Sequence, residues 1–181
     1  MAGFEYRGQL NGAENPVTLD LVIANSATVK VGDVLTMTAL ASGGGVSRAS
    51  AGNRVLGVCV GIVDQNGIDL DNTSPSNFDG TWTSSSKTYV ASSNNKTNKL
   101  VKAKVVVDKY SIWYNDTAGS LVAADEFKYF DLNDQDQIAD QDGHNTAGAF
   151  LLIKRDPDGD ADASKGLFVI TESYMNAYTQ A

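Results

Sequence analysis

The chain has 181 residues, 42% of them hydrophobic, and a formal net charge of −8 at pH 7. This length is enough for a domain with a core of its own. One cysteine excludes an internal disulfide, and one histidine excludes histidine-based metal sites and relays. The acidic balance argues against nucleic acid as a partner. No signal peptide is recognisable, and no stretch approaches the roughly 18 apolar residues of a membrane span, so we expect no membrane partner.

The negative charge belongs to the C-terminal part of the chain. Residues 1–110 carry 10 basic and 9 acidic side chains, whereas residues 111–181 carry 4 and 13. The acidic residues are mainly aspartates, 18 against 4 glutamates, and aspartate favours turns and loop ends. We therefore expect acidic loops between elements in residues 111–181.

The first 16 residues contain Phe4, Tyr6 and Leu10 among glycines and asparagines without a continuous pattern. This predicts an arm and not a core strand. Apolar and polar residues then alternate over residues 17–23, which is typical of a half-buried strand. The next strands are predicted on either side of the turn-forming pair Gly32-Asp33, within VKVGDVLTM.

Residues 54–63 are predicted to form a strand with one bulky and one small face. Gly57 and Gly61 weaken such a strand, so they indicate the close approach of another backbone or a strong bend, as in a small barrel. Cys59 is interpreted as a small core residue, because no cationic group or histidine lies near it in the sequence. Asn66-Gly67 predicts a hairpin turn.

The remainder of the chain also has strand patterns. Residues 71–99 are a Ser-, Thr- and Asn-rich excursion, residues 100–107 form a clear strand, and strand-like segments joined by acidic loops follow residue 121. We predict an all-β fold, a small β-barrel or β-sandwich with an extended N-terminal arm and an elaborated, Asp-rich C-terminal part. The arm is residues 1–16 and a single β-domain is 17–181, barrel-like over 17–110 and acidic over 111–181.

Two stretches carry residue types that could support chemistry. Residues 156–162 place four carboxylates at alternate positions, as a calcium loop does. Gly159 stands at the fourth position in place of the sixth, and Leu167 stands where the loop needs a glutamate, so we interpret this stretch as a solvated turn. His144 lies in a polar turn. We expect no catalytic residues, no metal site, no cofactor and no enzymatic activity.

The segment VKVGDVLTM at 29–37, followed by a small-residue loop and by AGNRVLGVCVGI at 51–62, resembles the capsid decoration, or cement, proteins of tailed bacteriophages. In that family a strand, a Gly-Asp turn and a strand precede an Ala-Gly-x-x-Val-Leu-Gly-Val strand that closes a small β-barrel. The similarity covers roughly residues 17–63, about a quarter of the chain.

The resemblance implies a non-enzymatic virion structural protein on the outer surface of a capsid, commonly a homotrimer, which stabilises the capsid by bridging major capsid protein subunits. An N-terminal arm that adds to the sheet of another subunit would use Phe4, Tyr6, Arg7 and Leu10, and a frayed terminus is the alternative reading of this stretch.

Two other functions stay open. The first is a carbohydrate-binding or adhesive β-domain of a head fibre, which would use the aromatic residues Trp82, Tyr89, Trp113 and Tyr114. The second is a hydrolase on a β-scaffold, for which the sequence offers no catalytic grouping.

Overall fold

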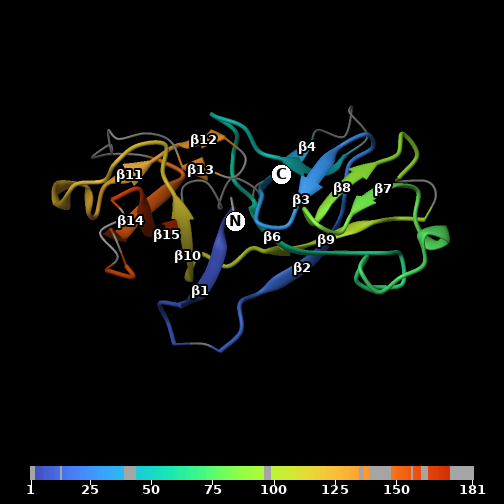
Figure 1. The fold of residues 1–181 in the computed structure, drawn as a ribbon, viewed down its shortest axis with the longest axis horizontal. Coiled ribbons are helices and arrows are strands. Elements are labelled where there is room, and N and C mark those ends of the chain that lie inside the picture. The colour runs from blue at the N-terminus through green and yellow to red at the C-terminus, as the bar shows by residue number, and fades with distance from the viewer. Residues whose placement is uncertain are drawn as a thin grey trace.

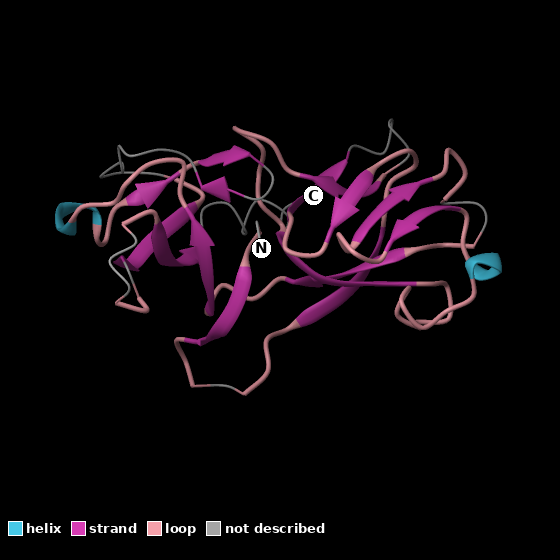
Figure 2. Ribbon diagram, viewed as in Figure 1, coloured by secondary structure: helices cyan, strands magenta, loops and turns pink. Residues whose placement is uncertain are grey.

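The structure is a computed structural model, and it describes residues 3–12, 14–38, 44–95, 99–134, 137–138, 148–155, 157–159 and 163–171. Strands account for nearly all of its regular structure, with two short 3₁₀ helices, η2 (Pro75–Asn77) and η3 (Ala123–Asp125), at opposite ends of the molecule (Figure 2). The predicted all-β class is confirmed.

The strands are short, and most contain between three and six residues. In chain order they are β1 (Glu5–Gln9), β2 (Thr18–Val22), β3 (Thr28–Lys30), β4 (Val34–Thr38), β5 (Gly45–Arg48), β6 (Gly57–Val63), β7 (Gly80–Thr83), β8 (Thr88–Ala91), β9 (Lys102–Val106), β10 (Ser111–Asp116), β11 (Tyr129–Phe130), β12 (Leu132–Asp134), β13 (Gln137–Ile138), β14 (Phe150–Arg155) and β15 (Lys165–Ile170).

These strands form two lobes along the long axis of the molecule (Figure 1). Lobe A contains a five-stranded antiparallel sheet in the order β1-β10-β15-β14-β11 and the pair β12-β13. Lobe B contains a five-stranded sheet in the order β2-β9-β6-β4-β5 and a three-stranded sheet in the order β3-β8-β7. The chain enters lobe A as β1, crosses to lobe B for β2 to β9, and returns to lobe A from β10 onward.

The larger sheet of lobe B curls without closing. Its two edge strands, β2 and β5, are connected only by an isolated parallel bridge between Ile23 and Val46. Because β5 has only four residues, it does not extend this contact into a ladder. Of the two folds expected, the closed small β-barrel is therefore wrong, and the described sheets pack as in a β-sandwich.

Gly57 is a strand glycine that the packing requires. A Cβ atom there would lie 2.1 Å from the carbonyl oxygen of Val106 on β9, so the predicted close approach of another backbone is confirmed. Gly61 differs, because the nearest atom to its added Cβ is the flexible Cδ of Lys104 at 3.5 Å. It follows a shift of register between Cys59 and Gly61, which is the mark of a bulge.

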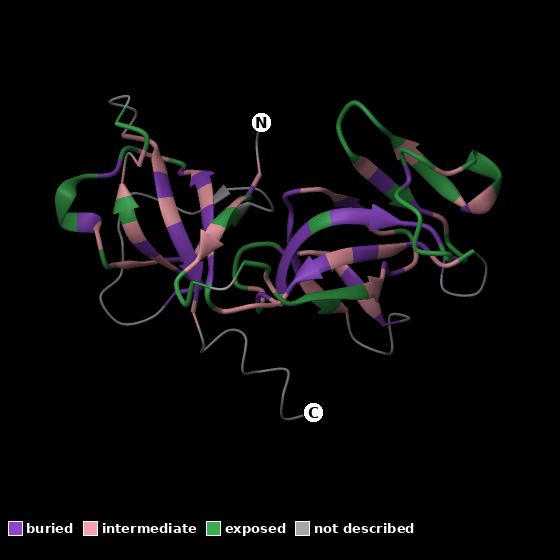
Figure 3. Ribbon diagram, turned by 90° about the horizontal axis from the view of Figure 1, so that it is seen from below, coloured by how far each residue is buried: buried purple, intermediate pink, exposed green. Residues whose placement is uncertain are grey.

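The apolar residues form two cores, and both lobes have buried interiors (Figure 3). The core of lobe B lies between its two sheets and includes Leu35, Ile62 and Tyr89. The other core fills lobe A and also takes in Val58 and Val106 of lobe B. The two lobes therefore share buried apolar surface, which fixes one against the other.

Residues 5–9 form an edge strand, so the expected arm is wrong for this stretch. β1 pairs antiparallel with β10, and Tyr6 stands opposite Trp113. Phe4 is 5% exposed and stacks on Phe150 with ring centroids 5.0 Å apart. The physical reason is the alternation of two aromatic residues, at positions 4 and 6, which gives a short strand an apolar face to bury.

Candidate functional site

The four residues expected to contact another subunit lie on or beside β1, and two of them face the interior. Phe4 belongs to the core of lobe A. Tyr6 packs on the same core and meets Trp113 edge to face, with ring centroids 5.7 Å apart. The aromatic side chains are therefore occupied within their own chain.

The other two residues face solvent. The guanidinium carbon of Arg7 lies 4.6 Å from the ring centroid of Tyr114, and its Nη2 donates to the Glu5 carboxylate at 3.4 Å. Leu10, which is 56% exposed, follows the strand. Of the four residues expected to contact another subunit, only Arg7 and Leu10 therefore present their side chains to a partner.

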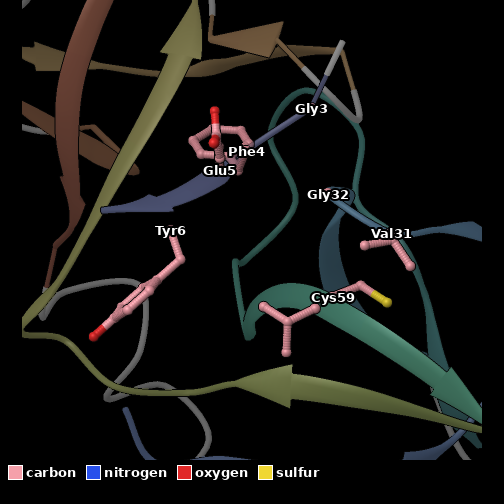
Figure 4. Close-up of a pocket in the computed structure, with 8 residues that line it drawn as sticks. Gly3, Phe4, Glu5, Tyr6, Val31, Gly32 and Cys59 are labelled. Atoms are coloured by element: carbon pink, nitrogen blue, oxygen red, sulfur yellow. The ribbon is translucent and has the colours of Figure 1, made fainter. Parts of the chain in front are cut away.

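A hollow of about 310 Å³ lies where the two lobes meet (Figure 4). One wall is the start of lobe A with β1, and the opposite wall is formed by β6 and the turn between β3 and β4. Glu5 is the only charged residue among its lining residues, which are Gly3, Phe4, Glu5, Tyr6, Val31, Gly32, Cys59 and Val60. The joint between the lobes therefore has a mainly apolar cavity open to solvent.

Two glycines hold the lobes together at this hollow. Gly3 and Gly32 approach so closely that a Cβ atom on either would lie 3.2 Å from the Cα of the other. Both have positive φ angles, +134° and +96°, which favour glycine. The amide of Phe4 donates to the Gly32 carbonyl at 2.9 Å. Neither contact had a sequence signal, since the two glycines are 29 positions apart.

Cys59 borders the hollow, but its side chain has no exposed surface. Burial raises the pKa of the thiol to about 12, which keeps it protonated at neutral pH. Its Sγ donates to the Gly61 carbonyl at 3.4 Å. The prediction of a small core residue is confirmed, and the hollow has no nucleophile from this thiol.

The turn that carries Gly32 depends on a buried carboxylate. Asp33 is fully buried, its Oδ2 accepts from the Lys30 amide at 2.7 Å, and Nε of Arg48 lies 2.8 Å from the same oxygen. The sequence predicted the turn from Gly32-Asp33 but not the ion pair with Arg48, which comes from β5. A buried charge of this kind needs its partner to remain stable.

A second hollow, of about 190 Å³, shares Val31 and Val60 with the first and extends to the β7-β8 hairpin. Asp71 organises it by accepting from Trp82 Nε1 at 3.1 Å and Ser84 Oγ at 2.6 Å, and by contacting Lys87 Nζ. The hydrogen bond from Lys87 is the first cause that lowers the pKa of Asp71 to about 2. At neutral pH the site therefore holds a carboxylate beside an indole.

Of the four aromatic residues that a carbohydrate-binding domain would use, two belong to the cores. Tyr89 and Trp113 have no exposed surface. Tyr114 is partly covered by Arg7 and lines a small hollow of about 180 Å³ at the start of lobe A, whereas Trp82 borders the second hollow. Trp82 and Tyr114 are thus the members of this set that line a cavity.

Exposed apolar side chains gather on the connection between the lobes. Leu10, Val17 and Leu19 are 56%, 58% and 46% exposed, and they lie within ten residues of chain that lead from β1 into β2. β2 is also an edge strand, so one side of its backbone is not paired along its length. Sequence alternation places Val17 and Leu19 on one face with Ile23, whereas in the structure Ile23 is buried and the other two are exposed.

Two sequence features fall largely outside the described residues. His144 lies outside them, as do all of residues 156–162 except 157–159. Within the described ranges, no three His, Cys, Asp or Glu side chains are grouped closely enough to hold a metal ion. The same part of the chain has no helix that is long and apolar enough to cross a membrane.

Comparison of the chain with protein-family models, with curated proteins and with solved structures finds no match. The fold and the candidate site define an all-β protein of two lobes with an apolar hollow at their joint and exposed apolar residues along the connection.

Proposed function

We propose that the chain is a capsid decoration protein, a non-enzymatic virion structural protein. It binds the outer surface of a tailed-bacteriophage capsid as a homotrimer and bridges major capsid protein subunits. The observation that carries this proposal is the unpaired edge of β2 beside the exposed Val17 and Leu19. Exposed apolar groups on a free strand edge suit attachment to another protein, either by strand addition or by apolar contact.

The packing of the segment that resembles the decoration family supports the proposal. Its two motif strands, β4 and β6, are neighbours in one sheet, with Val34 opposite Val58 and Leu35 opposite Gly57. The glycine of the Val-Leu-Gly-Val motif, Gly57, is the one where an added Cβ would lie 2.1 Å from the Val106 carbonyl oxygen of β9. The motif residues thus have packing roles that account for their residue types.

Attachment of many copies to one capsid also explains how small contact areas can hold the protein firmly. Several copies that each bridge two capsid subunits release only when all contacts break, so modest individual interfaces give a lasting clamp. Leu10 follows β1 of lobe A and Leu19 lies on β2 of lobe B, so exposed apolar residues for such contacts come from both lobes.

The test uses heads assembled without the chain, from the phage that encodes it. Purified chain is expected to co-sediment with these heads and to raise the temperature at which they release DNA. Leu19→Asp is expected to lose most of this binding, because it places a charge in the apolar contact. The matched control is Ile68→Asp, at a residue of similar exposure, 44%, outside the connection. Failure of the wild-type chain to bind, or equal binding by both variants, contradicts the proposal.

The alternative, a carbohydrate-binding or adhesive β-domain of a head fibre, is favoured by one observation. Trp82 borders the second hollow beside the carboxylate of Asp71 and the ammonium of Lys87. An aromatic face next to hydrogen-bonding groups is suited to a sugar ring. A glycan array decides between the two functions: binding of neutral oligosaccharides that is lost in Trp82→Ala, without binding to heads, supports the alternative.

A further inference from the structure

Phe127, between η3 and β11, combines two unfavourable features. Its side chain is 71% exposed, the largest value among the exposed large hydrophobic residues of the described chain. Its φ angle is +67°, in the left-handed region that favours glycine. The other non-glycine residues with positive φ in the described ranges are polar: Ser26, Lys87 and Lys99. A bulky apolar residue in this conformation is uncommon in folded proteins.

The backbone around Phe127 is firmly held. Asp125 is 3% exposed, its Oδ2 accepts from the Val122 amide at 2.8 Å, and its Oδ1 accepts from Lys128 Nζ at 3.1 Å. The amide of Phe127 donates to the Leu152 carbonyl of β14 at 2.8 Å, and the Leu152 amide donates to the Lys128 carbonyl at 3.0 Å. The backbone that carries the ring is therefore held in place, which reduces the backbone entropy lost on binding.

The fold of the chain itself gives no reason for this residue. The backbone conformation favours glycine, and the exposure favours a polar side chain. An observed outlier of this kind is evidence for a function that the isolated chain does not show. The neighbouring Val122 is also 56% exposed, so the end of lobe A carries a small apolar projection.

The hollow at the joint has the properties of a socket for such a projection. Its volume of about 310 Å³ is large enough for one aromatic ring and its walls include Phe4, Tyr6, Val31 and Val60. Val60, one of these lining residues, is 39% exposed, so part of its apolar side chain is open to solvent. η3, which Phe127 follows by two residues, lies at one end of the long axis (Figure 2), whereas the hollow lies between the lobes (Figure 4), so one copy cannot fill its own hollow.

The charges beside the two surfaces are already paired within the chain. Lys128, next to the projection, lies 3.1 Å from Asp125, and Glu5, in the wall of the hollow, lies 3.4 Å from Arg7. Contact between the two surfaces therefore brings neither of these charges into an apolar interface without its partner.

We propose that Phe127 of one copy inserts into the hollow between β1 and β6 of a second copy. The contact is head to tail, so each copy uses two different surfaces, and three such contacts close a ring if the rotation allows it. This inference rests on the proposed function in one respect, the homotrimer, because it identifies the surfaces through which the three copies would contact each other. Its test needs the purified chain alone, so its failure leaves attachment to a capsid untouched.

The first experiment measures assembly by sedimentation velocity at rising protein concentration. The wild-type chain is expected to sediment as an oligomer, whereas Phe127→Gly and Val60→Asp are each expected to sediment as monomers. Val90→Asp is the matched control, because Val90 is a strand valine of similar exposure, 43%, away from both surfaces. It is expected to assemble as the wild type does. A monomeric wild type, or an oligomer of Phe127→Gly, overturns the proposal.

The second experiment mixes the two monomeric variants. Phe127→Gly keeps the hollow and Val60→Asp keeps the projection, so one intact contact remains in the mixture. A 1:1 dimer that grows no further is expected, because the other two surfaces are blocked. A mixture that stays monomeric, or a dimer formed by either variant alone, overturns the head-to-tail contact.

A stability measurement separates the role of Phe127 from a structural one. Adding Phe127→Gly to the monomeric Val60→Asp chain is expected to raise the melting temperature, since glycine relieves the left-handed conformation and the exposed ring is removed. A fall in the melting temperature shows that Phe127 stabilises its own chain. It overturns the inference that this residue is present for contact with a second copy.

Discussion

At the scale of single residues, the buried carboxylate of Asp33 has the largest expected effect on stability. It is fully buried beside an Arg48 side chain that is 28% exposed, and it also accepts from the Lys30 amide. Asp33→Ala leaves a partly buried guanidinium without its partner and a turn amide without its acceptor. We expect the free energy of unfolding to fall by about 3 kcal/mol.

Urea unfolding measures this loss, and a surface ion pair provides the control. Lys104 Nζ lies 3.5 Å from Asp20, and both side chains are more than 40% exposed. Asp20→Ala is expected to change the free energy of unfolding by less than about 1 kcal/mol. Equal effects of the two substitutions would contradict a special role for Asp33.

Cys59 gives a second residue-scale prediction, on pH. Burial raises the pKa of its thiol from 9.0 to about 12 in the folded chain. The unfolded chain therefore loses this proton first as pH rises, so the stability from the buried thiol is full below pH 9 and disappears as pH rises toward 12. Between pH 8 and pH 10.5, wild type is expected to lose more stability than Cys59→Ala does.

The measurement is the urea midpoint of both chains across this range, together with thiol labelling at pH 8. An aromatic disulfide reagent is expected to label Cys59 only after unfolding, because the folded thiol is buried and protonated. Rapid labelling of the folded chain would show that the hollow exposes the sulfur.

At the scale of elements, β1 shows what the sequence could and could not predict. Phe4 and Tyr6 were recognised as important, but two aromatic residues among glycines and asparagines do not reveal that their partner strand, β10, lies a hundred residues away. Strand patterns at 17–23 and 100–107 predicted elements correctly, because alternation is a local signal. Their outward and inward faces were not fixed by alternation, as Val17 and Leu19 show.

The edge strand yields an element-scale prediction that separates a core strand from a free arm. Phe4→Ala removes a ring that stacks on Phe150 and is 5% exposed, and we expect a loss of about 3–5 kcal/mol in the free energy of unfolding. Leu10→Ala, at a side chain 56% exposed, is expected to change it by less than about 0.5 kcal/mol.

Equilibrium unfolding is followed by tryptophan fluorescence in a Trp82→Phe background, in which buried Trp113 is the one remaining tryptophan and reports on this strand. Deletion of residues 1–9 is expected to shift the emission of the folded chain to longer wavelength, since Tyr6 no longer covers the indole. A folded deletion variant with unchanged emission and stability would show that residues 1–9 form a free arm and not a core strand.

At the scale of the whole molecule, the sequence indicated the distribution of charge and the change of pattern near residue 110, where the chain passes from β9 to β10. It did not indicate that β1 joins the C-terminal strands, nor that a hollow lies at the resulting joint. Both depend on contacts between distant positions, such as Gly3 with Gly32 and Phe4 with Phe150. The projection at Phe127 also had no signal, since only the backbone conformation makes that residue unusual.

The joint between the lobes is a feature of the whole molecule that can be tested by adding a single methyl group. Gly32→Ala places a methyl group 3.2 Å from the Cα of Gly3 on a backbone with φ of +96°. Gly67→Ala is the matched control, because its φ is +80° and its added Cβ has no neighbour within 4 Å. Both substitutions incur the cost of the backbone conformation, about 1–3 kcal/mol, and only Gly32→Ala also forces the lobes apart. We expect Gly32→Ala to lower the urea midpoint further than Gly67→Ala does and to weaken the head-to-tail oligomer in sedimentation, which Gly67→Ala leaves intact. Equal midpoints and equal assembly in the two variants would show that the close approach of Gly3 and Gly32 does not fix the lobes, because the strain common to both would then account for the whole effect.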